Sequence, residues 1–171
     1  MRPETIAFGG SVTFMNELGL ADILRSKGTL TLIDAYAPGM TPEQGYEIRR
    51  RSLLADLFIT GTNALVSNGT LVNLDGTGNR VAAITFGPKH VVLFVGRNKI
   101  VESLDEAVSR VRNIAAPANA VRLKRKTPCA VSGVCSDCNS PERICSQWGV
   151  IVRCSPANRI HVVLINDDLG Y

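Results

Sequence analysis

Four cysteines lie close together near the end of the chain. Cys129, Cys135, Cys138 and Cys145 have the spacing C-x5-C-x2-C-x6-C. Thiolates bind soft metal ions and iron–sulfur clusters, and four of them this close in sequence can converge on one centre. Structural zinc sites more often use two CxxC pairs, and only one such pair occurs here. We therefore expect a 4Fe–4S cluster, with zinc as the alternative and free or redox-active thiols as a third interpretation.

The cellular compartment bears on this expectation. No apolar stretch approaches the roughly 20 residues of a membrane span, and the N-terminus lacks the apolar core of a secretory signal. We expect a cytoplasmic protein without a membrane span. In a reducing compartment, clustered thiols are more typical of metal ligands than of disulfides. The fifth cysteine, Cys154, falls in an expected strand, and we interpret it as a small buried apolar residue.

A glycine-rich turn near the N-terminus is a candidate anion site. The run Gly9-Gly10-Ser11-Val12-Thr13 follows a short apolar segment and opens an expected helix. Glycines let backbone N–H groups approach a ligand, a helix N-terminus favours an anion, and Ser11 and Thr13 add hydroxyl donors. The simpler interpretation is a tight strand-to-helix turn in which Ser11 caps the helix.

A second group of polar loop residues also follows expected strands. Turn formation alone does not require so many side-chain hydrogen-bonding groups, so the pattern favours ligand binding over simple turn chemistry. Asp75 is the only carboxylate here that could serve as a general base. The candidate residues are Gly61, Thr62, Asn63, Asn73, Asp75, Gly76, Thr77, Gly78, Asn79 and Arg80.

Composition narrows the class of protein. The chain has 171 residues, of which 45% are hydrophobic, and this excludes disorder and suits one domain over residues 1–171. The net charge of +4 is too small for a dedicated nucleic-acid binder. Two basic runs, Arg49–Arg51 and Arg122–Lys126, are interpreted as solvated helix faces, with a local anion site as the alternative.

The elements that must position these residues alternate between strand and helix. We expect helices to begin at Thr41 and Ser103, where capping boxes occur, and to run to about Ala55 and Ala115, with a hairpin around Ser67–Thr70. Alternating strands and helices predict an α/β fold with a mostly parallel sheet and helices on both faces in three layers. Residues 127–146 interrupt the pattern as a cysteine-rich loop. Strands are expected at Thr5–Phe8, Thr29–Ala35, Leu57–Thr60, Ala64–Val66, Leu71–Leu74, Val91–Val95, Val150–Arg153 and Ile160–Ile165.

Several segments resemble the LUD (lactate utilization) domain family. The run Asp56–Asn79, DLFITGTNALVSNGTLVNLDGTGN, is similar to the core motif of that family, and GGSVT at Gly9–Thr13 is similar to its first motif. The segments Gly96–Val101 and Asp168–Gly170 also match, and one subset of the family has a similar four-cysteine motif. The resemblance implies a fold shared with ribose-5-phosphate isomerase and CoA transferases, which bind phosphorylated or acyl ligands at glycine-rich strand ends.

The resemblance also implies a function. It points to a component of an iron–sulfur-dependent oxidation of lactate or a related organic acid, with iron–sulfur or flavin oxidoreductase subunits as partners and a small anionic ligand. The alternatives are a stand-alone enzyme acting on a phosphorylated or CoA-linked small molecule, and a non-catalytic electron-transfer or scaffold subunit. No nucleic-acid partner is expected.

The start of the chain differs from the family pattern. In the family a helical segment usually precedes the first glycine motif, whereas Gly9 lies almost at the N-terminus here. We expect that apolar surface normally covered by such a segment promotes association, and therefore predict a homo-oligomer or a larger native protein.

Overall fold

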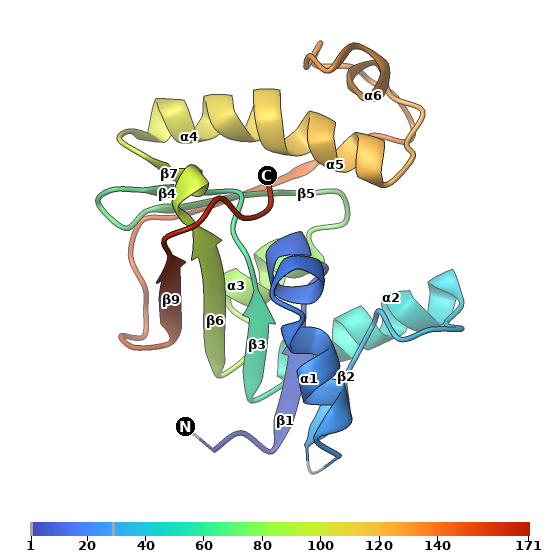
Figure 1. The fold of residues 1–171 in the computed structure, drawn as a ribbon, viewed down its shortest axis with the longest axis vertical. Helices are drawn as coiled ribbons and strands as arrows, with labels where there is room; N and C mark the ends of the chain where they lie inside the picture. Colours follow the sequence, from blue (N-terminus) through green and yellow to red (C-terminus); the bar gives the residue numbers. More distant parts are fainter. Residues whose placement is uncertain (1, 29) are drawn as a thin grey trace. The chain divides into compact units, whose positions relative to one another are not determined.

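A computed structural model describes residues 2–28 and 30–171 (Figure 1). Contacts between residues divide the chain into two compact units. Unit 1 contains Met1–Gly61, Ala82–Arg97 and Cys154–Gly170, and unit 2 contains Thr62–Val81, Asn98–Arg153 and Tyr171. No helix in the described ranges is both long and apolar enough to cross a membrane.

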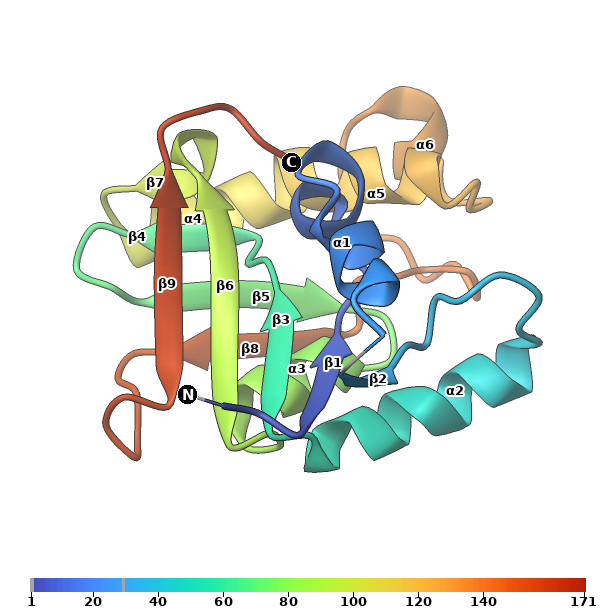
Figure 2. The same cartoon turned by 60° about the horizontal axis from the view of Figure 1, so that its bottom comes forward.

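Unit 1 is built on a five-stranded sheet in which every neighbouring pair is parallel (Figure 2). Its buried strand positions are mainly apolar, and the unbroken apolar run in the interior strand β6 suits a strand with neighbours on both sides. The strand order is β2 (Thr31–Ile33), β1 (Thr5–Phe8), β3 (Leu57–Thr60), β6 (His90–Gly96) and β9 (Ile160–Ile165).

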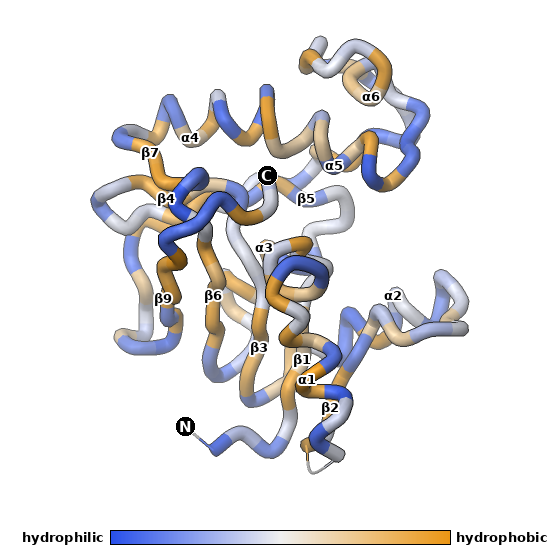
Figure 3. The backbone as a smooth tube through the Cα atoms, viewed as in Figure 1, coloured by the Kyte–Doolittle hydropathy of each residue, from blue (hydrophilic) through white to orange (hydrophobic). Residues whose placement is uncertain are grey.

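Helices cover this sheet. The helical turn η1 (Thr13–Glu17) and helix α1 (Leu20–Ser26) contribute Phe14 and Ala21 to an apolar cluster with strands β1 and β3. Helix α2 (Pro42–Arg51) leads into η2 (Ser52–Leu54). Figure 3 shows the apolar character of the strands that these helices flank.

Unit 2 holds a smaller mixed sheet. Strands β4 (Ala64–Val66) and β5 (Leu71–Asp75) form an antiparallel hairpin, β7 (Ile100–Val101) pairs parallel with β4, and β8 (Gln147–Ile151) pairs antiparallel with β5. Asn68 Oδ1 accepts a 3.0 Å hydrogen bond from the Thr70 N–H, which stabilises the tight turn of the hairpin.

A long helical segment packs on this smaller sheet. Helix α4 (Leu104–Arg110), η4 (Val111–Ala115) and α5 (Ala116–Arg122) follow one another without a break (Figure 1). Ala107 and Val111 pack against apolar residues of β4 and β5. The remaining elements are α3 (Asn79–Thr85), η3 (Arg97–Lys99) and α6 (Pro128–Ser132).

The structure confirms the α/β fold class and its mostly parallel sheet flanked by helices. Thr41 and Gln44 form the expected capping box, and Ser103 Oγ accepts from the Glu106 N–H. Because the contacts divide the chain into two units, the expectation of one domain over residues 1–171 stays a prediction.

Several expected boundaries were wrong. The helix that begins after Ser103 continues past Ala115 because α5 extends it to Arg122. The strand expected at Val150–Arg153 begins earlier, at Gln147, because its pairing with β5 sets its limits. Cys154 lies outside any strand and is only partly buried. Within the strand expected at Thr29–Ala35, residue 29 lies outside the described residues.

Candidate functional site

The four clustered cysteines line one small cavity in unit 2. Cys129 lies in α6, Cys135 and Cys138 lie in the loop after it, and Cys145 lies just before β8. The cavity has a volume of about 30 Å³, and Leu74, Ala116 and Trp148 also line it. All four thiols are free and partly buried. The four residues that the sequence spacing singled out therefore line the same cavity.

Local sequence features shape the loop around this cavity. Pro128 stands in the first turn of α6, where a missing N–H costs nothing, and Gly133 ends the helix at a φ of 74°. The Gly133 N–H donates to the Cys129 carbonyl at 2.9 Å. Asp137, between the two cysteines of the CxxC pair, has a φ of 47°, which turns the chain sharply there.

Two hydrogen bonds hold the ends of the loop together. The Lys126 N–H donates to Glu142 Oε2 at 3.0 Å, and Ser140 Oγ donates to the Lys126 carbonyl at 3.1 Å. Because these contacts span 16 and 14 residues, the segment that contains the first three cysteines is a closed loop.

Arg143 connects the two later parts of the cysteine cluster. Its Nη1 donates to the Cys138 carbonyl at 2.7 Å, and its Nη2 donates to the Cys145 carbonyl at 2.9 Å. The pKa of Arg143 is raised. The largest cause is a hydrogen bond with Cys145, together with the charge of that residue, and the charges of Asp137 and Cys138 add to it.

A second arginine lies at the same cavity. Asp137 Oδ1 is 3.7 Å from Arg112 Nη2 and 3.8 Å from Arg143 Nη2, and all three side chains line the cavity. Sequence reasoning missed both arginines. The SPERIC segment next to Cys145 offered a signal for Arg143, whereas nothing in the sequence linked Arg112 to cysteines more than 15 residues away.

The four thiols are the type of ligand that a metal ion or an iron–sulfur cluster requires. Their side chains, however, lie farther apart than the ligands of an occupied site. Within the described ranges, no group of three or more Cys, His, Asp or Glu side chains is close enough to hold a metal ion. The four soft thiol donors and the two flanking cations nevertheless match what a negatively charged thiolate centre needs.

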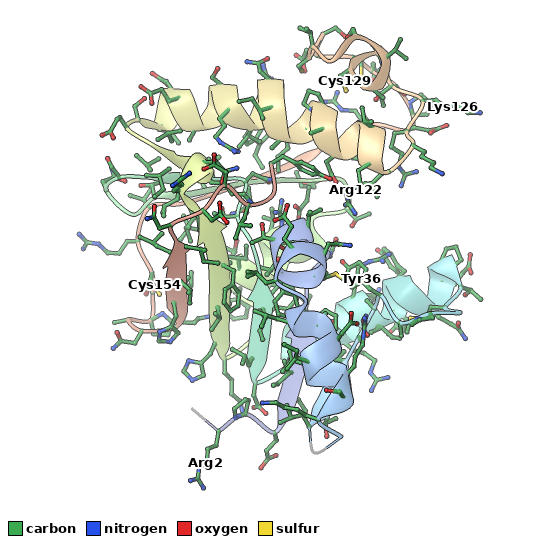
Figure 4. The ribbon with its side chains drawn as sticks, in the orientation of Figure 1. Arg2, Tyr36, Arg122, Lys126, Cys129 and Cys154 are labelled. Carbon is green, nitrogen blue, oxygen red and sulfur yellow. The ribbon has the colours of Figure 1, made fainter. Side chains whose placement is uncertain are left out.

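Cys154 has different surroundings. It belongs to unit 1 and is labelled in Figure 4. Its Sγ donates to the Pro156 carbonyl at 3.2 Å and accepts from the Ile160 N–H at 3.3 Å. It does not line the cysteine cavity.

The first glycine-rich turn lies in unit 1, at the carboxyl ends of β1 and β3. A Cβ at Gly9 would lie 2.6 Å from Thr60 Oγ1, and one at Gly61 would lie 2.8 Å from Ser11 Oγ. Both glycines are therefore needed to accommodate neighbouring hydroxyl groups. Ser11 Oγ accepts from the Phe14 N–H at 3.3 Å, which confirms its capping role.

Thr60 is a candidate that sequence reasoning missed. Its side chain is fully buried, and its Oγ1 has no hydrogen-bond partner in the part of the chain that the structure describes. The signal was available, because Thr60 ends an apolar strand directly before Gly61. Thr13, one of the predicted residues, is also fully buried.

The second polar loop lies in unit 2, and its charged residues bind one another. Arg80 Nη2 donates to Asp75 Oδ1 and to Asn63 Oδ1, both at 2.6 Å. Asp75 Oδ2 accepts from the Val81 N–H in the first turn of α3 at 2.8 Å. Asp75 therefore joins β5 to α3, and this structural role competes with its predicted role as a general base.

The other predicted residues of this loop are mainly engaged locally. Thr62 Oγ1 donates to the Ala64 and Val72 carbonyls, and Thr77 Oγ1 donates to Asn79 Oδ1. Asn73 differs, because it is buried and neither amide atom has a partner among the described residues. Gly76 and Gly78 lie in the turn after β5, and Gly78 has a φ of 79°. A ligand site shared with the Gly9 turn stays a prediction.

Comparison with known proteins gives a family match. The model of the family described as "LUD domain" matches residues 2–165. No curated protein matches the chain significantly.

Two solved structures are similar at low identity. A DUF162 family protein from Deinococcus radiodurans is 16% identical, with 94% of this chain and 86% of that chain covered and a TM-score of 0.40. Ribose 5-phosphate isomerase from Plasmodium falciparum is 14% identical, with 67% and 59% covered and a TM-score of 0.33.

Proposed function

This chain belongs to the LUD domain family, and from that premise we propose that it carries a 4Fe–4S cluster used in the oxidation of lactate or a related organic acid. Membership of the family implies a function of the lactate-utilization type. The observation that carries the cluster proposal is that Cys129, Cys135, Cys138 and Cys145 line one cavity. A reducing cytoplasm would keep these thiols available as ligands.

The residues of the cavity have distinct roles in this proposal. The four thiolates would hold the cluster, and the cluster, when bound, supplies one-electron transfer. Arg143 and Arg112 place positive charge at the cavity that the four cysteines line, and this charge would offset that of a thiolate-held cluster. Leu74 and Ala116 give the cavity apolar walls, which limit access of water.

The proposal also requires partner subunits. Oxidation of a hydroxy acid to an oxo acid releases a pair of electrons, whereas a single cluster carries one at a time. Iron–sulfur or flavin oxidoreductase subunits would therefore exchange electrons with this chain. If the chain itself binds no organic substrate, it would act in this proposal as a non-catalytic electron-transfer or scaffold subunit.

Metal analysis of protein purified without oxygen tests the cluster. We expect iron and sulfide near four each per chain, as a 4Fe–4S cluster requires. Cys138→Ser should lose most of both, whereas Cys154→Ser is the matched control and should retain them, because Cys154 does not line the cavity. One equivalent of zinc without iron would replace the cluster by a zinc site, and the absence of both metals would overturn the proposal.

A second candidate function is an enzyme that acts on a phosphorylated or CoA-linked small molecule. The observation in its favour is the buried Thr60 hydroxyl beside the glycine-rich turn, which has no hydrogen-bond partner among the residues that the structure describes. Calorimetric titration with inorganic phosphate and with coenzyme A tests it, with Thr60→Val and Ser11→Ala as variants. Binding that both variants weaken would support this function, and the absence of binding to wild-type protein would remove it.

A further inference from the structure

The net positive charge of the chain is concentrated in the elements that carry the cysteines. Residues 111–146 contain six Lys or Arg and two Asp or Glu, a net charge of +4, which equals the net charge of the whole chain. The other 135 residues contain 13 basic and 13 acidic residues and are neutral as a set. This uneven distribution of charge creates a local positive electrostatic potential, which the net charge of the whole chain does not reveal.

Four of these cations lie at the end of α5. Arg122, Lys124, Arg125 and Lys126 are all exposed. The chain leaves the helix through a Schellman-type turn, in which Lys124 has a φ of 53° and its N–H donates to the Val121 carbonyl at 2.9 Å. The turn therefore fixes the path of a backbone that carries three consecutive cations.

The acidic side chain of Glu142 lies beside these cations but bonds a backbone group. Among the described residues, Lys124, Arg125 and Lys126 form no ion pair, and Glu142 Oε2 is engaged by the backbone N–H of Lys126. Charge at a helix C-terminus is favourable, but that effect falls off within the last turn and does not account for Lys126.

Exposed apolar side chains accompany the cations. Val131 is 92% exposed and Val134 is 63% exposed. Val131 follows Cys129 by two residues, and Val134 directly precedes Cys135. Figure 4 shows Lys126 on the connection that leads from α5 to Cys129 in α6. Cations, exposed valines and cysteines thus belong to one continuous segment.

We propose that this α5–α6 surface, defined as Arg122, Lys124, Arg125, Lys126, Val131 and Val134, docks an acidic electron-carrier protein. The inference rests on the proposed function, because a carrier must come close to the cysteine-held centre. A cluster, when bound, would supply one electron to the oxidised carrier, which would be reduced as the cluster is oxidised, and no atom would be transferred. Small redox interfaces form through opposite charges around a limited apolar contact.

The composition of the segment favours a protein partner over a nucleic acid. Single-stranded nucleic acids are bound through aromatic stacking together with basic charge, and residues 111–146 contain no aromatic side chain. Asp137 and Glu142 also lie within the segment, which weakens its attraction for a phosphate backbone.

Charge reversal in the full-length chain tests the surface. Lys124→Glu, Arg125→Glu and Lys126→Glu are combined in one variant, and Arg49→Glu, Arg50→Glu and Arg51→Glu form a matched control with the same change in charge on α2. The probe is an acidic 2Fe–2S ferredoxin, and binding is measured by calorimetry at low and high salt. We expect the first variant to bind at least about tenfold more weakly and the control to stay within about twofold of wild type.

The outcomes separate this inference from the proposed function. An equal loss of ferredoxin affinity in both variants, or no loss in either, would overturn the proposal that the α5–α6 surface docks the carrier. Tighter binding of a single-stranded oligonucleotide than of the ferredoxin at the same salt would overturn the protein partner. Iron and sulfide are assayed in every sample, so that a missing cluster with intact charge-dependent binding contradicts the proposed function alone. Substitution of the same three cations by Gln provides a second variant if charge reversal prevents folding.

Discussion

The guanidinium group of Arg143 donates a 2.7 Å hydrogen bond to the carbonyl oxygen of Cys138, five residues earlier. It also binds the Cys145 carbonyl, so one side chain fixes the backbone on both sides of the cavity. Outer-shell contacts of this kind orient ligands, and their loss typically weakens metal affinity.

Replacement of Arg143 should therefore impair metal binding more than folding. We expect Arg143→Met to lower zinc affinity about tenfold in a chelator competition at neutral pH. Arg143→Lys should recover part of the loss, because it keeps the charge but not the two-pronged geometry. Equal zinc affinity of Arg143→Met and wild type would contradict a role for this side chain at the site.

Arg159 should be important for stability. Its guanidinium is buried and donates to the carbonyls of Ala83, Ile84 and Pro88, at and after the C-terminal end of α3. Arg159→Met leaves these carbonyls without donors, and we expect about 3 kcal/mol lower free energy of unfolding in urea titrations.

The control for this prediction is an exposed arginine. Arg97 pairs with Asp168 at 2.8 Å, but both side chains are more than half exposed. Arg97→Ala should lower the free energy of unfolding much less than Arg159→Met does, because water screens the exposed pair. Similar losses for the two variants would show that burial of Arg159 does not decide its contribution.

Thr60 should behave unlike a bonded threonine in the neighbouring strand. Thr60 Oγ1 is buried without a partner among the described residues, so Thr60→Val should leave the free energy of unfolding unchanged or raise it by up to about 1 kcal/mol. Thr5 Oγ1 bonds Asp56 Oδ2 at 3.0 Å, so Thr5→Val should lower stability by about 1 kcal/mol. Urea titration of both variants checks the contrast, and a marked loss in Thr60→Val would refute it.

Asp56 should make stability depend on pH in acid. Its pKa is held well below the usual value, first by a hydrogen bond from Lys89 and then by hydrogen bonds from Thr5. Because the folded-state pKa is lower than the unfolded one, this stabilisation is present above about pH 4 and is lost as the pH falls through the folded-state value.

Asp56→Asn removes this contribution. The urea midpoint of the variant should lie below that of wild type at pH 7, and the gap should narrow as the pH falls below about 4. Urea midpoints of the two proteins, measured at pH 7 and at a pH below about 4, check the prediction. A gap of constant size would mean that the carboxylate charge does not stabilise the fold.

The sequence by itself determined the local elements. Continuous apolar runs identified the strands β3 and β6, the Asn68-Gly69 pair identified the hairpin, and Thr41 with Gln44 identified the start of α2. Each of these signals depends on residues that are close in the chain, where steric and hydrogen-bonding preferences act directly. The cysteine spacing likewise predicted a common site, because four residues of one short loop cannot lie far from one another.

The tertiary structure alone decided how polar side chains are used. The contacts of Asp75 with Arg80 and the start of α3 became visible only in the structure, where they give it a structural role beside its predicted one. Arg112 joined the cysteine cavity only through the packing of the long helix on the hairpin. Hydrogen bonds and charges select partners by distance and direction in space, and those are set by packing between segments far apart in the sequence.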